Sequence, residues 1–510
     1  MADKPTTQPS FSAARKWASH LNAWAAIAVV LALGVMLNYL ASRHFTRVQL
    51  TDQRRTQLSP QTLRVLRSLT NEVRGTLFFD TRGQEELHGL TTALLREYNY
   101  ANPKILFKTV DPVRQPAKAE LLLAKYKLTG LKDKNFIILD CGGRTKVIYE
   151  SELSDYDINA VVSGRAKEFR RIAFKGEMLF TTALFNLANP RQYKICFLQG
   201  HGEHDPDKLD TPHGYGKFAA ILAERSNAQW EKLTLLGTND IPADCHLLVI
   251  AGPRLPFADI ELEKIRRFLK QGGRLFALIG NLAYTGSRLT GLEKLLAESG
   301  IGIAANMVFD PQNSPTGNDL LTAGMNRAHP IMKALMSDDA DLRLRLVLPR
   351  AVGKSTNTNS SPDAPQVTVL ATTSEAGTEA SEIRDGVPYR NPYTDHTGNF
   401  PLIAAAEQGS VKGVTTERGS MRLVVVGDSL ALDNELIDTA PANHYFAALS
   451  VDWLLDRPEV LLQGLLPRPL KEYRVIMTTW QQKTVAAILL VAMPGTLLLL
   501  GGLVWWRRRK

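Results

Sequence analysis

The sequence predicts an α/β protein with two tandem α/β domains, each built on a mostly parallel sheet and flanked by an N-terminal and a C-terminal transmembrane helix. Three observations support this fold class. The chain has 510 residues, which at about 150 residues per domain is too long for a single core. Short apolar strands alternate with amphipathic helices, and a long uncharged run lies near each end.

The first uncharged run, residues 21–41, reads LNAWAAIAVVLALGVMLNYLA. About 21 residues of helix at 1.5 Å per residue span the roughly 30 Å hydrocarbon core of a bilayer. The run exceeds the usual h-region of a signal peptide, and no A-x-A cleavage site follows it. We therefore expect an uncleaved membrane anchor, preceded by a cytoplasmic tail over residues 1–20.

Residues 58–165 are predicted to form the first α/β domain. LSPQTLRVLRSL at 58–69 has a Ser cap followed by Pro at the first helical position, which starts a helix. Further predicted helices are 85–100 and 120–126, and predicted strands are 72–80, 104–112 and 135–140. Residues 166–189, with the run KGEMLFTTALFNLAN, are expected to form a connecting helix.

Residues 190–456 are predicted to form the second domain, with helices on both faces of its sheet. Between 353 and 400 the composition shifts to Ser, Thr, Asn, Pro and Gly, which predicts a loop-rich insertion with one short strand at 367–373. The strands are predicted at 193–199, 230–236, 246–252, 274–279, 399–407 and 421–430, and the helices at 214–225, 258–271, 291–300 and 444–456.

A linker over 457–483 is predicted to lead to a second transmembrane helix, residues 484–506. This helix ends in Trp505 and Trp506, as expected of an interfacial aromatic belt, and a basic cytoplasmic tail follows at 507–510. Pro494 and Gly495 predict a kink at its middle. A buried core helix is the alternative for either run, but a soluble helix of this length usually carries charge.

The formal net charge of +10 is concentrated at the ends, where the first 20 residues contribute a net +2 and residues 507–510 contribute +4. The interior therefore lacks the basic surface of a nucleic-acid-binding protein. By the positive-inside rule, both ends face the cytoplasm and the bulk of the chain is periplasmic, giving a two-pass protein of the bacterial inner membrane. Four arginines just after the first run oppose this orientation: Arg43, Arg47, Arg54 and Arg55.

The densest polar cluster is QGHGEHD, directly after the strand at 193–199. Loops at the carboxyl ends of parallel strands are where open α/β sheets bind ligands. Three readings stay open: a catalytic metal site, a ligand or partner contact, and a structural loop that caps backbone groups and the helix near Gly214. The spacing fits no zinc motif, so we expect no bound metal. The candidate residues here are His201, Gly202, Glu203 and His204.

Two further strand-end turns, IAGPR at 250–254 and VVGDS at 425–429, make Gly252 and Asp428 candidate ligand- or partner-binding residues. Turn chemistry alone also explains them. No nucleophile elbow, nucleotide-binding signature or C-x-x-C pair occurs, so no catalytic residue or cofactor is predicted. Asp395 and His396 lie in the insertion and are expected to be solvated.

The order of these motifs resembles the auxiliary components of poorly characterised ABC transport systems, of the type of the gliding-motility protein GldG. The resemblance implies a second domain similar to the glutamine-amidotransferase-like fold without its nucleophile. It also implies partners, namely a separate ABC-type ATPase and a multi-span permease. The features that carry it are LSPQTLRVLRSL, VDP, GEMLFTTAL, GHGE, LLVIAGPR, GGRLFALI, VVVGDSL and NHYFAALSVDWLL.

The expected function is that of a non-catalytic accessory membrane subunit of an ABC-type complex, in contact with the lipid bilayer. Its periplasmic α/β region would bind a partner or substrate. The alternatives are a membrane-anchored cell-envelope scaffold or carbohydrate-binding protein, and a metal-dependent hydrolase that uses the GHGEHD loop. The sequence does not name the transported substance.

Overall fold

The structure is a computed structural model, and the chain divides into two compact units, residues 1–55 and 56–510. It combines several sheets with helices, as predicted for an α/β protein. It describes residues 13–43, 58–80, 82, 85–128, 133–156, 170–189, 192–226, 228–282, 289–336, 342–355, 364–384, 387–409, 419–457, 468–469 and 478–509.

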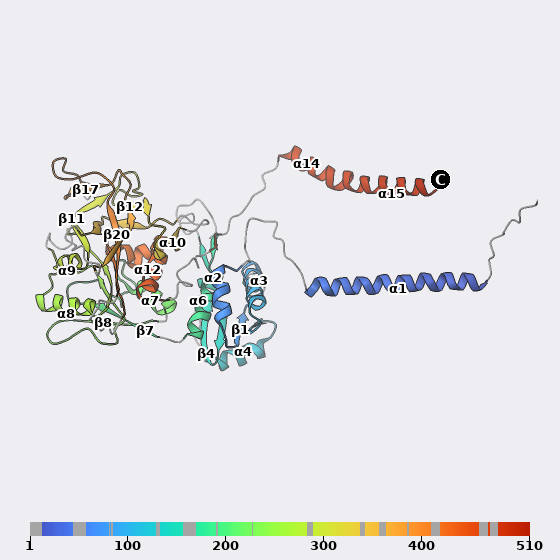
Figure 1. The fold of residues 1–510 in the computed structure, drawn as a ribbon, viewed down its shortest axis with the longest axis horizontal. Coiled ribbons are helices and arrows are strands. Elements are labelled where there is room, and N and C mark those ends of the chain that lie inside the picture. The colour runs from blue at the N-terminus through green and yellow to red at the C-terminus, as the bar shows by residue number, and fades with distance from the viewer. Residues whose placement is uncertain are drawn as a thin grey trace, which may run out of the picture. The chain divides into compact units, whose positions relative to one another are not determined.

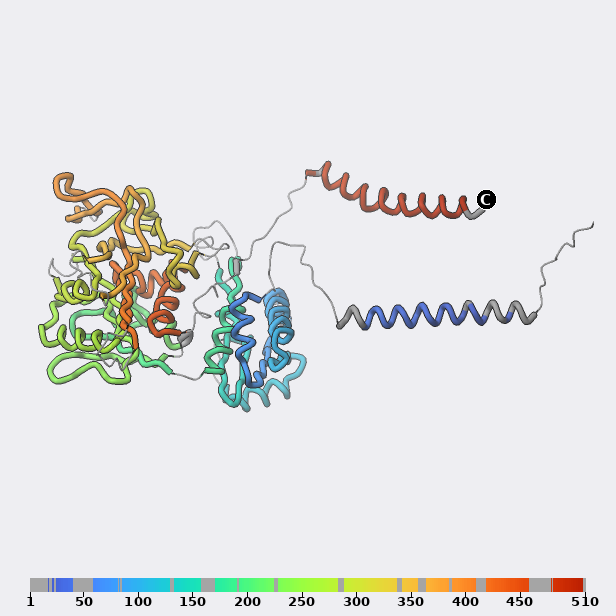
Figure 2. The backbone as a smooth tube through the Cα atoms, viewed as in Figure 1, coloured from blue at the N-terminus to red at the C-terminus, as the bar shows by residue number. Residues whose placement is uncertain are grey.

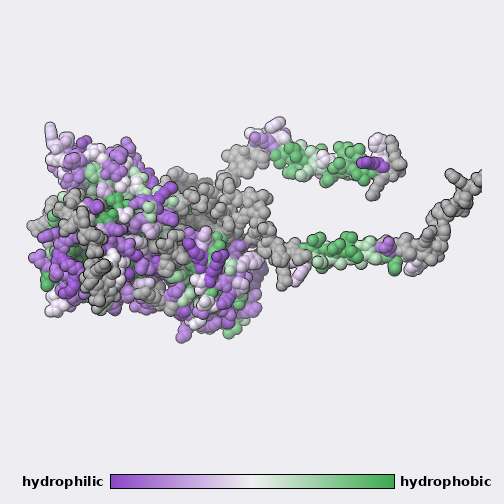
Figure 3. Space-filling view, in the orientation of Figure 1, coloured by the Kyte–Doolittle hydropathy of each residue, from purple (hydrophilic) through white to green (hydrophobic). Residues whose placement is uncertain are grey.

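The two apolar runs differ in how well they meet the requirements of a membrane span. The C-terminal helical stretch Trp480–Arg507 has 28 residues and contains an 18-residue window with a mean hydropathy of 2.3, so it is long and apolar enough to cross a bilayer. The N-terminal helix α1 (Ala13–Arg43) contains a shorter apolar stretch, Trp24–Tyr39. Both appear as green helices in Figure 3. Among the described residues, only the C-terminal helix is long and apolar enough to cross a bilayer, so the second predicted span is not established.

A π-helical turn, η4 (Ile488–Ala492), interrupts the C-terminal helix between α14 (Thr479–Ala487) and α15 (Met493–Arg509). It ends two residues before Pro494, whose ring removes a backbone donor and crowds the carbonyl four residues earlier. A π-turn widens the helix and relieves that crowding. The predicted irregularity at Pro494 is therefore present, and Figure 2 shows the red helix curving along its length.

The sheet of residues 73–149 is a correction to the predicted topology. Its strand order is β2-β1-β3-β4, with β1 and β2 parallel and the other two pairings antiparallel, so it is not mostly parallel. Gly142 and Gly143, both with positive φ, join β3 to β4 as a hairpin, which requires antiparallel strands. The strands are β1 (Val73–Phe78), β2 (Ile105–Val110), β3 (Phe136–Cys141) and β4 (Arg144–Tyr149).

Helix α6 (Gly176–Ala188) packs against this sheet and against α2 (Pro60–Ser68) and α3 (Glu85–Ala101). Glu177 on α6 is buried and accepts hydrogen bonds from Ser59 N and Thr62 Oγ1, both at 2.7 Å. These bonds fix the start of α2. The remaining elements of this region are α4 (Pro116–Lys125), η1 (Glu150–Leu153), β5 (Ser154–Tyr156) and β6 (Arg171–Phe174).

A short sheet in the order β22-β6-β5 includes residues from far along the chain. β22 (Arg468–Pro469) lies within the predicted linker and pairs antiparallel with β6, opposite Phe174 and Ala173. Of the rest of that predicted linker, the structure describes Arg457 and the residues from Thr478 onward. The C-terminal segment is therefore tied to β6.

The large sheet has the strand order β13-β16-β20-β21-β10-β9-β7-β8. The five strands from β21 to β8 are mutually parallel, and β20, β16 and β13 extend the sheet antiparallel. The strands are β7 (Tyr193–Leu198), β8 (Ala228–Leu233), β9 (Leu247–Ala251), β10 (Arg274–Leu278), β13 (Gly324–Met325), β16 (Gln366–Thr372), β20 (Pro401–Gln408) and β21 (Met421–Val426).

Helices cover both faces of this sheet, as predicted (Figure 1). Along β7, Ile195 and Phe197 enter one core while Cys196 and Leu198 enter the other, because successive strand side chains alternate. One face packs on α7 (Gly216–Ser226), α10 (Pro330–Leu335) and α12 (Pro441–Leu454), and the other on α8 (Asp259–Lys270) and α9 (Leu292–Glu298).

The insertion at 353–400 is more regular than predicted. Besides β16, its described residues form short strands and a hairpin, and residues 356–363 and 385–386 lie outside the described set. Asp395 is buried rather than solvated, and its Oδ2 accepts from Ser381 N at 3.0 Å and Asn391 N at 2.8 Å. Further strands, of which β11, β12 and β14 precede the insertion, are β11 (Ile301–Phe309), β12 (Asp319–Leu321), β14 (Arg345–Val347), β15 (Arg350–Lys354), β17 (Thr378–Ala380), β18 (Glu382–Arg384) and β19 (Val387–Tyr389).

Candidate functional site

The parallel strands bring three separate turns to one edge of the large sheet. The GHGEHD loop follows β7, Gly252 follows β9 and Asp428 follows β21. Because β21, β10, β9 and β7 are neighbours and run in one direction, their carboxyl ends lie side by side. The sequence candidates are therefore gathered at one edge.

His204 is the centre of this cluster and is buried. Its Nδ1 lies 2.7 Å from the carbonyl oxygen of His213, so Nδ1 carries the proton and Nε2 is left as an acceptor. Ser429 Oγ lies 3.2 Å from Nε2 and donates to it. Burial lowers the pKa of His204 to about 4, so the ring is neutral near pH 7.

Tyr215 lies directly before α7 and contacts both His204 and Ser429. Its ring stacks on His204 with centroids 4.8 Å apart, and its hydroxyl donates to the carbonyl of Ser429. Burial raises the pKa of Tyr215 well above its usual range, which keeps the phenol protonated as a donor. The hydroxyl of Ser429 is therefore bonded to His204 and its carbonyl to Tyr215, and both partners come from the segment between β7 and α7.

Gly252 is required by close approach of the backbone. Its φ is +67°, and a Cβ at this position would lie 2.7 Å from Ser429 Cβ and 2.9 Å from His204 Cδ2. Only glycine leaves room for the β9 turn to pass between these two side chains. Gly252 therefore serves the packing of the His204 cluster.

His201 and Glu203 fasten the same loop to α8. His201 Nε2 lies 3.0 Å from Glu261 Oε2, and Glu203 Oε2 accepts from the His201 backbone at 2.7 Å. The His201 ring also packs on Phe257, with centroids 4.1 Å apart. Glu261 accepts from Ala258 N at 2.9 Å at the start of the helix. The loop is thus clamped to the N-terminus of α8.

The hydrogen bonds of this clamp do not use every polar atom of its side chains. His201 Nδ1, Glu203 Oε1 and Glu261 Oε1 are buried and have no hydrogen-bond partner among the described residues. His201 Nδ1 and Glu203 Oε1 are 3.5 Å apart, and burial raises the pKa of Glu203, which favours its protonated form. Within the described part of the chain, no group of three or more His, Cys, Asp or Glu side chains is arranged to hold a metal ion.

Asp428 is also engaged with the backbone. It is buried, and its two carboxylate oxygens accept from Val347 N and Leu430 N, each at 2.7 Å. Burial raises the pKa of Asp428 to about 7 despite these bonds. The side chain therefore ties β14 to the turn after β21.

Gly202 is the exposed member of the predicted set. Its φ is +81°, and a Cβ there would lie 3.3 Å from Arg254 Cβ, so Arg254 covers the loop. Arg254 N donates to the His201 carbonyl at 2.7 Å. The sequence places Arg254 and Ser429 in the two strand-end turns but indicates no role for them. No sequence pattern identifies Tyr215 or Glu261 as site residues, because their contacts arise only in the folded chain.

Five large aliphatic side chains are exposed on loops and helix starts that follow strands of the large sheet. Leu255 N donates to the His201 carbonyl at 2.9 Å, and Leu236 follows β8 beside Gly200. We call these residues the aliphatic rim, because each lies on a loop or helix start at the carboxyl edge of the sheet and is 54% to 60% exposed. Its members are Leu209, Leu236, Leu255, Ile260 and Leu289.

Comparison with protein families finds two matches. The family described as an ABC-type uncharacterized transport system matches residues 192–449, just over half the chain. A domain of unknown function, DUF7088, matches residues 52–153. No curated protein matches the chain.

Several solved structures are similar at low identity. The mmIFT52 N-terminal domain is 17% identical with a TM-score of 0.36, covering 51% of this chain and 96% of its own. A putative ThuA-like protein from Bacteroides uniformis is 13% identical with a TM-score of 0.32, covering 51% of this chain and 91% of its own. An exo-beta-1,4-mannosidase from an Opitutaceae bacterium is 11% identical with a TM-score of 0.27, covering 73% and 50%.

Proposed function

This chain belongs to the family of ABC-type uncharacterized transport systems, and we propose that it is a non-catalytic accessory subunit whose strand-end surface binds a partner of the complex. The family assigns it an auxiliary role in such a system. The further step rests on the strand-end edge, where buried polar groups shape the loops and aliphatic side chains face solvent.

The polar residues of the edge support a structural use rather than chemistry. His204, Ser429 and Asp428 are buried, and their hydrogen bonds are made to one another or to the backbone. A hydroxyl beside a neutral imidazole is also the arrangement of a nucleophile and its base. Here Ser429 and His204 are both covered by the loops that they hold together, so we propose no catalytic role for them.

The aliphatic rim is the feature that favours partner binding. Single exposed leucines are common on soluble proteins, but five exposed aliphatic side chains on the loops and helix starts at one edge of one sheet favour an interaction site there. Such a surface can be buried only by another apolar surface, such as a loop or helix of a permease. We propose that the permease contacts this rim and that the ATPase associates through the permease.

Charged substitutions in the rim test this function. We expect Leu236→Asp together with Leu255→Asp to reduce co-purification of the ATPase and permease in mild detergent by about tenfold, because a buried unpaired carboxylate is costly. The melting temperature should stay within about 2 °C, since both side chains are exposed.

The matched control replaces two exposed leucines of the other sheet region, Leu106→Asp with Leu121→Asp. It should leave co-purification unchanged. If the ATPase and permease remain bound to the Leu236→Asp, Leu255→Asp variant, the aliphatic rim is not the contact surface. If the wild-type chain purifies without ATPase or permease, the accessory role itself is refuted.

We further propose a two-pass topology in the inner membrane, with residues 21–41 and 484–506 as spans and both ends cytoplasmic. The basic residues at the two ends and the hydropathy of Trp480–Arg507 support it. A thiol introduced by Ser10→Cys should react with a membrane-impermeant reagent only after the membrane is opened. Labelling from the periplasmic side of intact cells would contradict this topology.

A further inference from the structure

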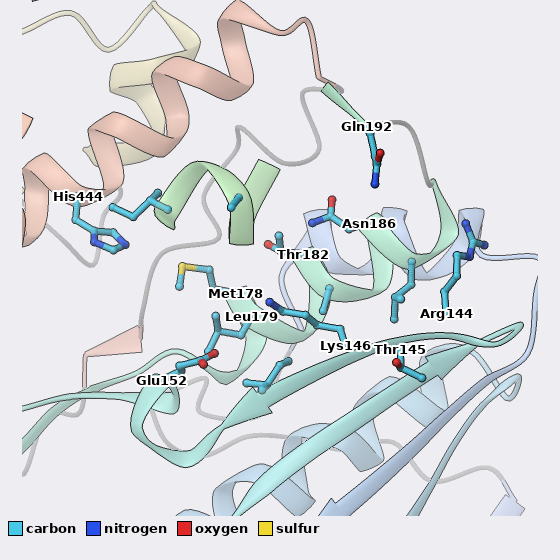
Figure 4. Close-up of a pocket in the computed structure, with 15 residues that line it drawn as sticks. Arg144, Thr145, Lys146, Glu152, Met178, Leu179, Thr182, Asn186, Gln192 and His444 are labelled. Atoms are coloured by element: carbon cyan, nitrogen blue, oxygen red, sulfur yellow. The ribbon is translucent and has the colours of Figure 1, made fainter. Parts of the chain in front are cut away.

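Two arrangements of charged side chains in the folded region differ in how specific they are. A cavity of about 360 Å³ beside helix α6 is lined by Arg144 and Lys146 among other residues. Figure 4 shows their charged ends pointing to opposite ends of this cavity, so they form no shared site for an anion. The clamp between the GHGEHD loop and α8 is more specific, because two buried polar atoms there lie 3.5 Å apart without forming a hydrogen bond.

His201 lies between two carboxyl groups in this clamp. Its Nε2 is 3.0 Å from Glu261 Oε2, and its Nδ1 is 3.5 Å from Glu203 Oε1. The three side chains are between 0% and 6% exposed, so water screens their charges little. On the Glu203 side the hydrogen bonding is incomplete, because His201 Nδ1 and Glu203 Oε1 have no partner among the described residues.

One proton decides whether these two atoms attract or repel each other. A neutral imidazole that donates from Nε2 to Glu261 leaves its Nδ1 as an acceptor. An ionised Glu203 would place a second acceptor beside Nδ1, and both buried atoms would stay unsatisfied. A proton on Glu203 Oε1 donates to Nδ1 after a small rotation of either side chain, and it satisfies both atoms at once.

The surroundings favour this proton on Glu203 over the other two groups. Glu261 lies in the first turn of α8 and accepts from Ala258 N at 2.9 Å, so the N-terminus of the helix stabilises its negative charge. A proton on His201 would leave three charges buried, where a neutral Glu203 beside a neutral imidazole leaves one. Burial raises the pKa of Glu203, although its Oε2 accepts from the His201 backbone.

Other ionisable groups around the clamp are engaged elsewhere. His204 on the same loop is neutral, because burial lowers its pKa to about 4. Arg254, in the turn after β9, is exposed and lays its aliphatic stem against Gly202. Lys264, one turn further along α8, donates to three backbone carbonyls of the loop after β8. Within the described part of the chain, these groups therefore leave the space between His201 and Glu203 to the proton.

We propose that Glu203 is a proton-binding site, and that the bound proton fastens the GHGEHD loop to α8 near neutral pH. When the proton leaves, the facing acceptors repel and the loop loosens from the helix. In the unfolded chain Glu203 is an ordinary glutamate that loses its proton near pH 4. The stability that the proton contributes is therefore complete below about pH 4, and it is lost as the pH rises through the pKa of Glu203 in the folded chain. The proposal does not rest on the accessory role, because it involves no partner.

Glu203→Gln tests this site, because the amide can donate to His201 Nδ1 at every pH while its oxygen accepts from the His201 backbone. The measurement is the melting temperature of the full chain in detergent micelles at pH 5 and pH 7. Between these values the unfolding equilibrium constant of wild type should rise at least tenfold relative to Glu203→Gln, a relative fall of about 3 °C or more. Asp428, whose pKa burial raises to about 7, titrates in both proteins and cancels in the comparison.

Glu375→Gln, at an exposed position of the same region, is the matched control and should follow wild type at both pH values. Infrared spectroscopy at pH 6 gives a second readout. Glu203→Gln should remove one carbonyl band of a protonated carboxyl group, and Glu375→Gln should retain it. His201→Gln should shift the same band, because the acceptor of the proton is gone.

The proposal is overturned if Glu203→Gln and wild type lose stability in parallel between pH 5 and pH 7, or if Glu203→Gln retains every protonated-carboxyl band. If Glu203→Gln does not fold, the His201→Gln spectrum decides. A shifted band supports a proton shared between Glu203 and His201, and an unchanged spectrum overturns it.

Discussion

Gly427→Ala is expected to destabilise the region of the large sheet, with a loss of more than about 4 kcal/mol in its free energy of unfolding. A Cβ on Gly427 would lie 1.9 Å from the carbonyl oxygen of Arg350 and 3.2 Å from that of Leu402. Both neighbours are backbone atoms of adjoining strands, and hydrogen bonds at 2.7 Å and 3.0 Å hold them against Gly427. Neither strand can retreat without breaking its ladder.

The measurement is the melting temperature of the full chain, which should fall by about 10 °C or more for a region of this size. Gly398→Ala is the matched control, because a Cβ there meets nothing within 4 Å. It should change the melting temperature by no more than about 2 °C. A Gly427→Ala chain that melts like wild type would show that the backbone of Arg350 does not lie against Gly427.

Glu293→Ala is expected to cost about 3 to 5 kcal/mol, because it leaves the buried guanidinium of Arg350 without a counter-ion. Glu293 Oε1 accepts from Arg350 Nη1 at 2.9 Å, and the Arg350 side chain is only 1% exposed. Glu293 Oε2 also accepts from Thr290 N and Oγ1, so the same carboxylate caps the start of α9. Both functions are lost together.

Chemical denaturation compares this variant with Glu298→Ala on the same helix, which breaks the partly exposed pair with Arg266 and should cost about 1 kcal/mol or less. Replacing both Glu293 and Arg350 by Met should restore part of the lost stability, because no unpaired charge is left. A double variant no more stable than Glu293→Ala would assign the loss to packing and helix capping instead.

The sequence predicted the large sheet better than the small one, for identifiable reasons. β7, β9, β10 and β21 each contain a continuous run of apolar residues followed within two residues by Gly, which is typical of buried parallel strands. The β3-β4 hairpin was missed although Gly142 and Gly143 mark a tight turn. β4 is an edge strand whose first three residues are polar, so its hydrophobicity is too low to stand out.

At the candidate site, the sequence indicated which loops meet but not what their side chains do. The shared edge of parallel strands places His204 near Gly252 whatever the details. The partner of His201 is Glu261, 60 residues away on the face of α8, and no local pattern predicts that contact. Burial is equally invisible in a polar run such as GHGEHD, so its structural use emerged only from the fold.

The pairing of β22 with β6 has a mechanical consequence. Among the described elements between α12 and α14, β22 is the point where the chain leading to the C-terminal helix is attached to a sheet. β6 runs directly into α6, whose Phe180 and Met178 belong to two different hydrophobic cores. A pull on the chain that follows β22 therefore loads a two-residue ladder on a strand that leads into a helix shared by both cores. So short a ladder separates before either core deforms, and the load then passes along the chain to α12.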